Sequence, residues 1–102
     1  MLSDQERDVL LDSRPERTVT KAHIESLIVD RHFYVPQGTT LTICVLSLKN
    51  GFQIVGESAC AHGRNFDAEL GMKIAYDNAF SKIWPLEGYL LREALYHEVH
   101  KQ

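Results

Sequence analysis

The sequence has no apolar run close to the roughly 20 residues that a membrane-spanning helix needs. Its first residues lack the basic-then-apolar order of a secretory signal peptide. It contains only two cysteines, Cys44 and Cys60, which are too few for the disulfide framework of a small secreted domain. These absences predict a cytoplasmic protein that keeps both thiols reduced.

Basic charge is not in excess either. Eleven Lys and Arg residues stand against fourteen Asp and Glu residues, so the formal net charge is −3. This balance argues against non-specific nucleic-acid binding, which usually needs a basic face, although a local basic pocket is compatible with it.

Motifs for catalysis and for metal binding are missing as well. The chain has neither a glycine-rich phosphate loop nor a nucleophile elbow. Glu57, Ser58 and His62 do not form a triad without a positioned orienting group. Cys60 and His62 are one pair, whereas structural zinc usually takes four ligands. We therefore predict no catalytic residue, no metal and no cofactor.

With 102 residues, the chain is expected to form one domain over residues 18–102, preceded by a charged appendage at residues 1–17. In the appendage, Ser3 and Glu6 form a capping box for a short helix that Pro15 would end. A chain of this length buries only about 60–65% of its unfolded surface. Oligomerisation would add buried surface, and we expect a homo-oligomer.

The clearest local signal is Asn50-Gly51 between two apolar runs. Both central residues of a type I′ turn need positive φ, which Asn and Gly tolerate best, so the pattern predicts a two-residue hairpin. Such a loop would set Lys49 opposite Phe52, Leu48 opposite Gln53 and Leu46 opposite Val55.

The strand before this turn is apolar on both faces, because Ile43 and Val45 point one way and Leu46 and Leu48 the other. It is therefore expected to be central in its sheet or covered by another subunit.

The other elements follow from periodicity and from breakers. A short helix is expected at residues 18–28 with Thr20 as its cap, and strands at residues 29–35, 39–48 and 52–55. A long helix would run from an Asn65 cap to Trp84, because Pro85 disfavours helical geometry before it, and a second helix would follow. The sequence thus predicts an α+β fold: an antiparallel sheet of three or more strands, a short N-terminal helix and two C-terminal helices packed on one face.

Within the long helix, Gly71, Ala75 and Ala79 form a row at four-residue spacing. Small side chains in such a row let another backbone approach closely.

Four segments in order resemble a family of small tailed-phage and prophage proteins, the gene-product-forty-nine / gene-product-sixty-six family, over about residues 18–96. They are LSLKNGF at 46–52, GESAC at 56–60, NFDAELG at 65–71 and KIWPLEGYLL at 82–91. The order of elements is also similar to that of the Thoeris anti-defence sponges of the first type, phage proteins that sequester cyclic nucleotide immune signals without cleaving them. This second resemblance implies a symmetric oligomer with nucleotide pockets between subunits, in the host-cell cytoplasm.

The best candidate for a binding site is the corner at residues 58–66, which runs from Ser58 through small residues to a predicted helix start. Free N–H groups at such a start favour an anion. Arg64 could pair with a phosphate, and Phe66 could stack on a base. The structural alternative is a capped loop, with Asn65 serving its own helix and Arg64 in water.

Asn78 is the polar residue in an otherwise small or apolar row of the long helix. Its amide would either bind a ligand or satisfy a main-chain group.

Together with the two resemblances, these residues support a first hypothesis: a phage accessory protein that sequesters a small anionic signal, a cyclic nucleotide, without catalysis. The alternative is a protein–protein interaction module that modulates a host or phage protein.

Overall fold

The structure is a computed structural model that describes residues 3–7 and 17–100. The chain divides into two compact units. The sheet unit is Ile28–Ile83, and the terminal unit combines Met1–Leu27 with Trp84–Gln102. A domain boundary at residue 17 stays a prediction, because residues 8–16 lie outside the described part of the chain.

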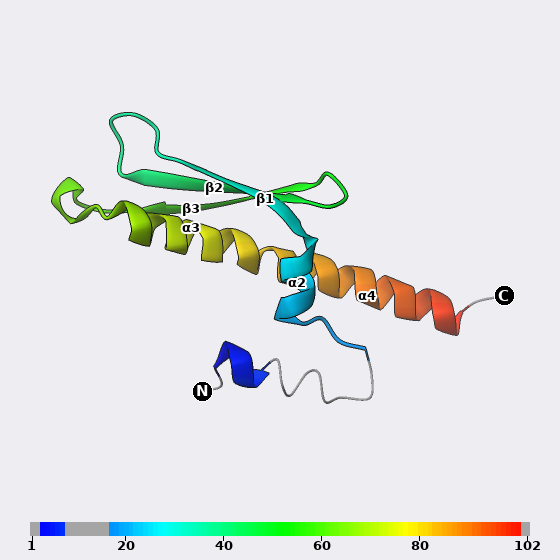
Figure 1. The fold of residues 1–102 in the computed structure, drawn as a ribbon. Coiled ribbons are helices and arrows are strands. Elements are labelled where there is room, and N and C mark those ends of the chain that lie inside the picture. The colour runs from blue at the N-terminus through cyan, green and yellow to red at the C-terminus, as the bar shows by residue number, and fades with distance from the viewer. Residues whose placement is uncertain (1–2, 8–16, 101–102) are drawn as a thin grey trace. The chain divides into compact units, whose positions relative to one another are not determined.

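The sheet unit contains three antiparallel strands in the order β1-β2-β3 (Figure 1). They are β1 (Ile28–Tyr34), β2 (Leu41–Leu48) and β3 (Gln53–Ala59). A short 3-10 turn, η1 (Gly63–Asn65), leads to α3 (Ala68–Ser81). The predicted α+β class is confirmed, and so is the central position of the strand before the hairpin.

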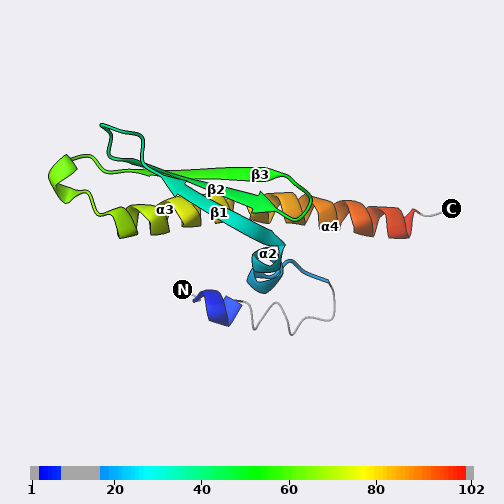
Figure 2. The same ribbon diagram turned by 45° about the horizontal axis from the view of Figure 1, so that its top comes forward.

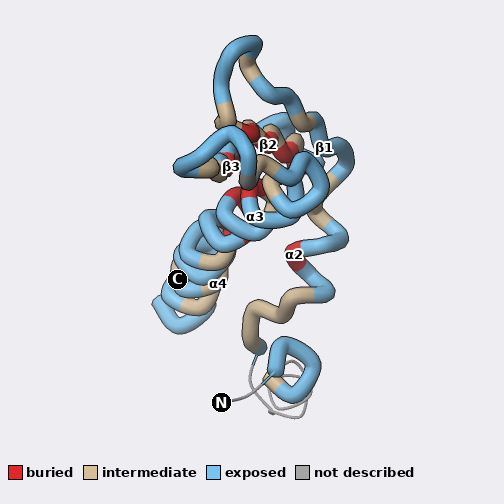
Figure 3. Tube along the Cα trace, turned by 90° about the vertical axis from the view of Figure 1, so that its left-hand side faces the viewer, coloured by how far each residue is buried: buried red, intermediate tan, exposed pale blue. Residues whose placement is uncertain are grey.

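One face of the sheet is covered by α3, which runs along β2 and β3 (Figure 2). On β2 every second side chain is buried and the others are half-buried, as expected for a strand that alternates between a covered and an open face. Figure 3 shows that the buried positions gather where β2, β3 and α3 face one another. The apolar members of this core are Cys44, Leu46, Leu48, Ile54, Ala75, Ala79, Phe80 and Ile83.

The main chain of α3 packs directly against the main chain of β3, because a glycine of the strand faces alanines of the helix. A Cβ atom added to Gly56 of β3 would lie 2.2 Å from the Ala79 nitrogen and 2.3 Å from the Ala75 carbonyl oxygen. One turn earlier in α3, a Cβ atom on Gly71 would lie 2.7 Å from Thr42 Oγ1. The row of small residues therefore has the role that its spacing predicted, and the backbone that approaches it belongs to Gly56.

The hairpin exists, but its predicted turn type and register are wrong. Gly51 has φ +90°, whereas no described residue other than glycine has positive φ, so Asn50 does not take the type I′ conformation. The Gly51 N–H donates to the Leu48 carbonyl and the Leu48 N–H donates to the Phe52 carbonyl, both at 2.9 Å. These bonds close a three-residue loop.

The longer loop shifts the register by one residue, so that Leu46 faces Ile54 and Val45 faces Val55. The core explains this choice. A register slip of one residue would move every side chain of β3 to the opposite face of the sheet. Only the observed register places Ile54 beside Leu46 under α3.

The predicted boundaries of the long helix are also corrected. α3 begins at Ala68 with Asp67 as its N-cap, and it ends at Ser81 with Lys82 as its C-cap. The next helix, α4 (Ile83–Val99), starts before Pro85 instead of after it. Proline is tolerated there because the first-turn N–H groups of a helix have no partner within the helix.

The terminal unit contains a helical turn at residues 4–7, the short helix α2 (Lys21–Leu27) and most of α4. The Glu6 N–H donates to Ser3 Oγ at 3.1 Å and the Ser3 N–H to Glu6 Oε1 at 3.2 Å, which confirms the capping box. The His23 N–H donates to Thr20 Oγ1 at 3.1 Å, which confirms the cap of α2. Pro15, the predicted end of the first helix, lies outside the described residues.

Within the described ranges, no helix combines the length and the apolar character needed to cross a membrane.

Candidate functional site

A cavity of about 160 Å³ lies at the predicted corner of the sheet unit. Ser58 and Phe66, two of the five predicted site residues, line it. The rest of the lining comes from the start of β2, the end of β3 and the first half of α3: Thr40, Ala59, Cys60, Asp67, Leu70, Gly71 and Ile74. The lining is mostly apolar, with hydroxyl groups on one side, and it resembles a small-molecule site in composition.

Two hydroxyl groups give the cavity its polarity. Ser58 Oγ donates to the Gly71 carbonyl at 2.8 Å, and Thr40 Oγ1 donates to the Cys60 carbonyl at 2.5 Å. A hydroxyl has one hydrogen and two lone pairs, so each of these oxygens is left as an acceptor. The cavity therefore suits a ligand group that carries N–H donors better than a phosphate, which offers only acceptors.

The predicted cap of the long helix is corrected by the position of Asp67, and the anion site itself stays a prediction. Asn65 belongs to η1 and does not cap α3, because the Asp67 Oδ1 atom accepts from the Leu70 N–H at 3.1 Å. This carboxylate takes the favourable place at the positive end of the helix. A phosphate placed there would meet a negative charge at an N-terminus that is already capped.

Arg64 is exposed in the turn that precedes the cap. Its main-chain N–H donates to His62 Nδ1 at 3.1 Å, which fixes the start of η1. The side chain of Arg64 is not part of the cavity lining.

Asn78 takes the structural role of its two predicted alternatives. Its Nδ2 atom donates to the Glu57 carbonyl at 2.7 Å and so links α3 to β3. Lys82 makes a similar link, from Nζ to the Val55 carbonyl at 2.7 Å. The structure thus brings Ser58 and Phe66 together but uses Asn78 to hold the strand.

Neither cysteine forms a disulfide. Burial raises the pKa of the Cys44 thiol, and the nearby Arg31 charge offsets part of that effect. Cys44 therefore stays protonated and unreactive at neutral pH. Cys60 lines the corner cavity and donates from Sγ to the His62 carbonyl at 3.1 Å.

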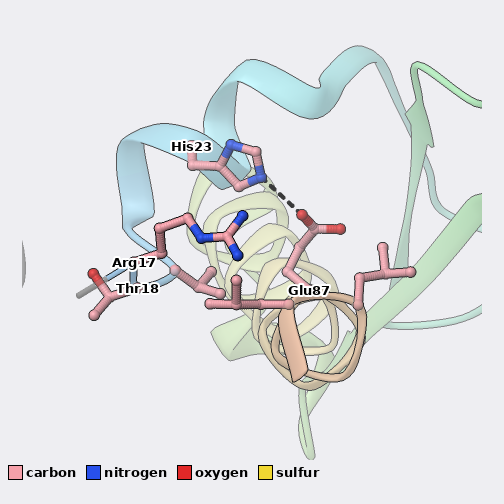
Figure 4. A pocket seen from close by; sticks show the side chains of 7 residues that line it. Arg17, Thr18, His23 and Glu87 are labelled. Atoms are coloured by element: carbon pink, nitrogen blue, oxygen red, sulfur yellow. Dashed lines mark hydrogen bonds and ion pairs between the residues drawn. The ribbon is translucent and has the colours of Figure 1, made fainter. Parts of the chain in front are cut away.

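A second and larger cavity, of about 390 Å³, lies in the terminal unit (Figure 4). His23 of α2 and Glu87 of α4 meet at its side, with 2.8 Å between His23 Nε2 and Glu87 Oε1. Arg17 also lines it and forms an ion pair of 2.7 Å with Glu98. The remaining lining residues are Thr18, Val19, Leu90 and Leu91. Sequence reasoning missed this cavity, because no local pattern relates His23 to a carboxylate 64 positions later.

The described part of the chain holds no group of three or more His, Cys, Asp or Glu residues arranged to bind a metal ion.

Residues 19–95 match the model of a family described as Phage protein (N4 Gp49/phage Sf6 gene 66) family. The chain belongs to this family. The match spans the complete sheet unit, including the corner cavity, together with α2 and most of α4. The family predicted from the four sequence segments is confirmed, and the chain is a phage protein. The searches of curated proteins and of solved structures returned no match to the chain.

Proposed function

We propose that this phage protein is a non-catalytic accessory protein that binds and sequesters a small ligand at the corner cavity. The observation that carries the proposal is the coincidence of this cavity with the corner that the sequence singled out for binding. The ligand class that suits it is a cyclic nucleotide, bound through its base.

In this proposal different parts of the ligand contact different residues. A base would enter the cavity, where Phe66 offers a stacking face. The oxygen atoms of Ser58 and Thr40 would accept hydrogen bonds from its amino group. At about 160 Å³ the cavity is smaller than the roughly 300 Å³ of a complete ligand pocket, so the sugar and phosphate would lie outside it, where the proposal gives Arg64 the contact with phosphate.

Sequestration acts by mass action and not by turnover. The protein would lower the free concentration of an immune signal in proportion to its own abundance and affinity. No acid–base pair is required for this role, and the ligand would be recovered unaltered in the host-cell cytoplasm.

Isothermal titration calorimetry with cyclic di- and trinucleotides and cyclic ADP-ribose isomers tests the proposal. We expect Phe66→Ala and Arg64→Ala each to weaken binding at least about tenfold, roughly 1.4 kcal/mol, with little change in melting temperature. Arg17→Ala, in the other cavity, is the matched control. Binding lost in Arg17→Ala but kept in both corner variants would contradict the assignment to the corner, and recovery of a cleaved nucleotide would contradict sequestration.

The second candidate is the protein–protein interaction module. The observation that favours it is the apolar character of the sheet face opposite α3, where Tyr34 and Val55 are exposed and Ile43 and Val45 are half-buried. A purified complex of defined stoichiometry with one host or phage protein, free of small molecules by mass spectrometry, would support this reading. Val55→Lys should then abolish the complex and leave nucleotide binding unaffected.

A further inference from the structure

The two free edges of the three-stranded sheet differ in their open hydrogen-bonding groups. Successive residues of an antiparallel strand point their N–H and C=O groups alternately toward a neighbour and away from it. An edge strand therefore presents a row of unpaired groups that another strand can use.

On β3 this row is occupied. The Val55 and Glu57 carbonyl groups point away from β2, because they accept hydrogen bonds from Lys82 Nζ and Asn78 Nδ2, each at 2.7 Å. Both donors come from α3 and its C-cap. A strand that approached this edge would have to displace two existing hydrogen bonds.

On β1 the outward main-chain groups make no hydrogen bond to another described element of the sheet unit. The Arg31 N–H donates to Asp30 Oδ1 of its own strand at 2.8 Å, so the main chain of Arg31 points away from β2, as does that of Phe33. Within the sheet unit no other described group bonds the Arg31 carbonyl or the outward main-chain groups of Phe33. Large apolar side chains are exposed on this strand, with Val29 at 60% and Tyr34 at 55%.

The sequence of β1 is self-complementary about Arg31. In an antiparallel pair centred on this residue, Asp30 of one strand faces His32 of the other, while the register shift between Ile28 and Asp30 ends the regular pairing before Val29. The same contacts recur on the other side of the two-fold axis. A hydrogen-bonded pair of side chains stabilises a sheet when the two lie directly across from one another.

The central pair would place two Arg31 residues opposite each other, which is unfavourable if both side chains lean toward the axis. In the structure the Arg31 guanidinium lies over the ring of Tyr76 in α3, 5.0 Å from the ring centroid. Because α3 of the same copy holds this guanidinium, the main chain at Arg31 can pair without bringing the two Arg31 charges together.

We propose that the β1 edge is the self-association surface of this protein, with β1 of a second copy paired antiparallel to it and Arg31 at the two-fold axis. Asp30 then exchanges its bonds within the strand, to the Arg31 N–H and to His32 Nε2, for an interaction with His32 of the other copy. The two sheets join into one. This inference is independent of the ligand proposed above.

The test uses two complementary variants of the full chain, measured by native mass spectrometry and sedimentation velocity. Asp30→Lys makes β1 basic, and His32→Glu makes it acidic. Asp30→Lys alone removes the carboxylate that faces His32, and His32→Glu alone sets a second carboxylate opposite Asp30, so we expect the dimer of each variant to dissociate at least about tenfold more readily than that of the unmodified protein. Mixed together, the two variants set the introduced lysine opposite the introduced glutamate and keep one Asp30–His32 pair, so they should form a heterodimer in preference to either homodimer.

The mixture experiment distinguishes pairing between copies from destabilisation of each variant. Loss of the Asp30–His32 contact within one strand could weaken folding, but it would give no preference for a heterodimer. Glu57→Lys on β3 is the matched control and should leave the dimer unchanged. A monomeric unmodified protein at about 100 µM would overturn the proposal, as would variants that self-associate like the unmodified chain or a mixture without heterodimer preference.

Discussion

The two sides of the sheet show two different ways to finish an edge. On the β3 side, α3 lies against the backbone at Gly56 and supplies donors to two outward-facing carbonyl groups. On the β1 side the helix makes a ring contact, Tyr76 with Arg31, and the strand exposes Val29 and Tyr34. The same helix that closes one edge leaves the other available. Three predictions, in order of expected effect, test how α3 is held against the sheet.

The largest effect is expected from Gly56→Ala. The added Cβ would lie 2.2 to 2.6 Å from main-chain atoms of Ala75 and Ala79, which cannot move without shifting the helix. Overpacking of this kind costs about 1–3 kcal/mol and more where backbone is involved, so we expect the free energy of unfolding to fall by about 3 kcal/mol. Urea denaturation measures it.

Gly88→Ala is the control for this substitution. A Cβ atom at Gly88 of α4 meets no atom within 4 Å, and alanine is the better helix former, so stability should rise by roughly 0.5–1 kcal/mol. Equal effects of the two substitutions would show that close backbone approach does not hold α3 on β3.

An intermediate effect is expected from Asn78→Ala. The substitution removes the donor to the Glu57 carbonyl and should cost about 1 kcal/mol. It should also raise hydrogen exchange along β3, because the helix no longer holds that edge. Asp77→Asn, which removes only an exposed ion pair with Lys73, should change stability by less than about 0.5 kcal/mol. Exchange rates on β3 that match the unmodified protein would contradict the role assigned to Asn78.

An effect of similar size but opposite sign is expected from Thr42→Val. Thr42 is 1% exposed, and its Oγ1 atom has no hydrogen-bond partner in the structure. A methyl group of similar size removes the cost of burying an unpaired hydroxyl, so we expect stability to increase by about 1 kcal/mol. Thr42→Ser, which keeps the hydroxyl, should give no gain. A lower melting temperature for Thr42→Val would mean that the hydroxyl has a role beyond packing.

Several features of the fold could be predicted because they depend on neighbouring residues. Thr20 and Ser3 cap helices as expected, since capping needs only a hydroxyl and a nearby N–H. Alternation along β2 indicated its two faces, and the row from Gly71 to Ala79 indicated a close contact. Ser58 and Phe66, which the sequence placed at one corner, line the same cavity.

Other features could not be predicted because they depend on competition between distant groups. Asn65 and Asp67 are both good caps, and the choice between them was made by the extra turn of η1. Asn50-Gly51 favours a two-residue loop, yet the core required the register that a three-residue loop provides. Pro85 reads as a helix break, although the first turn of α4 accepts it.

By itself the sequence determined the family, the α+β class, the order of the elements and the corner where a ligand site was expected. Each of these follows from local periodicity, from turn residues or from segments read in order. The tertiary structure alone decided the hairpin register, the partner of Gly56, the role of Asn78 and the difference between the two sheet edges. These depend on which side chains meet across the fold, and packing and hydrogen bonding settle that only when helix and sheet come together.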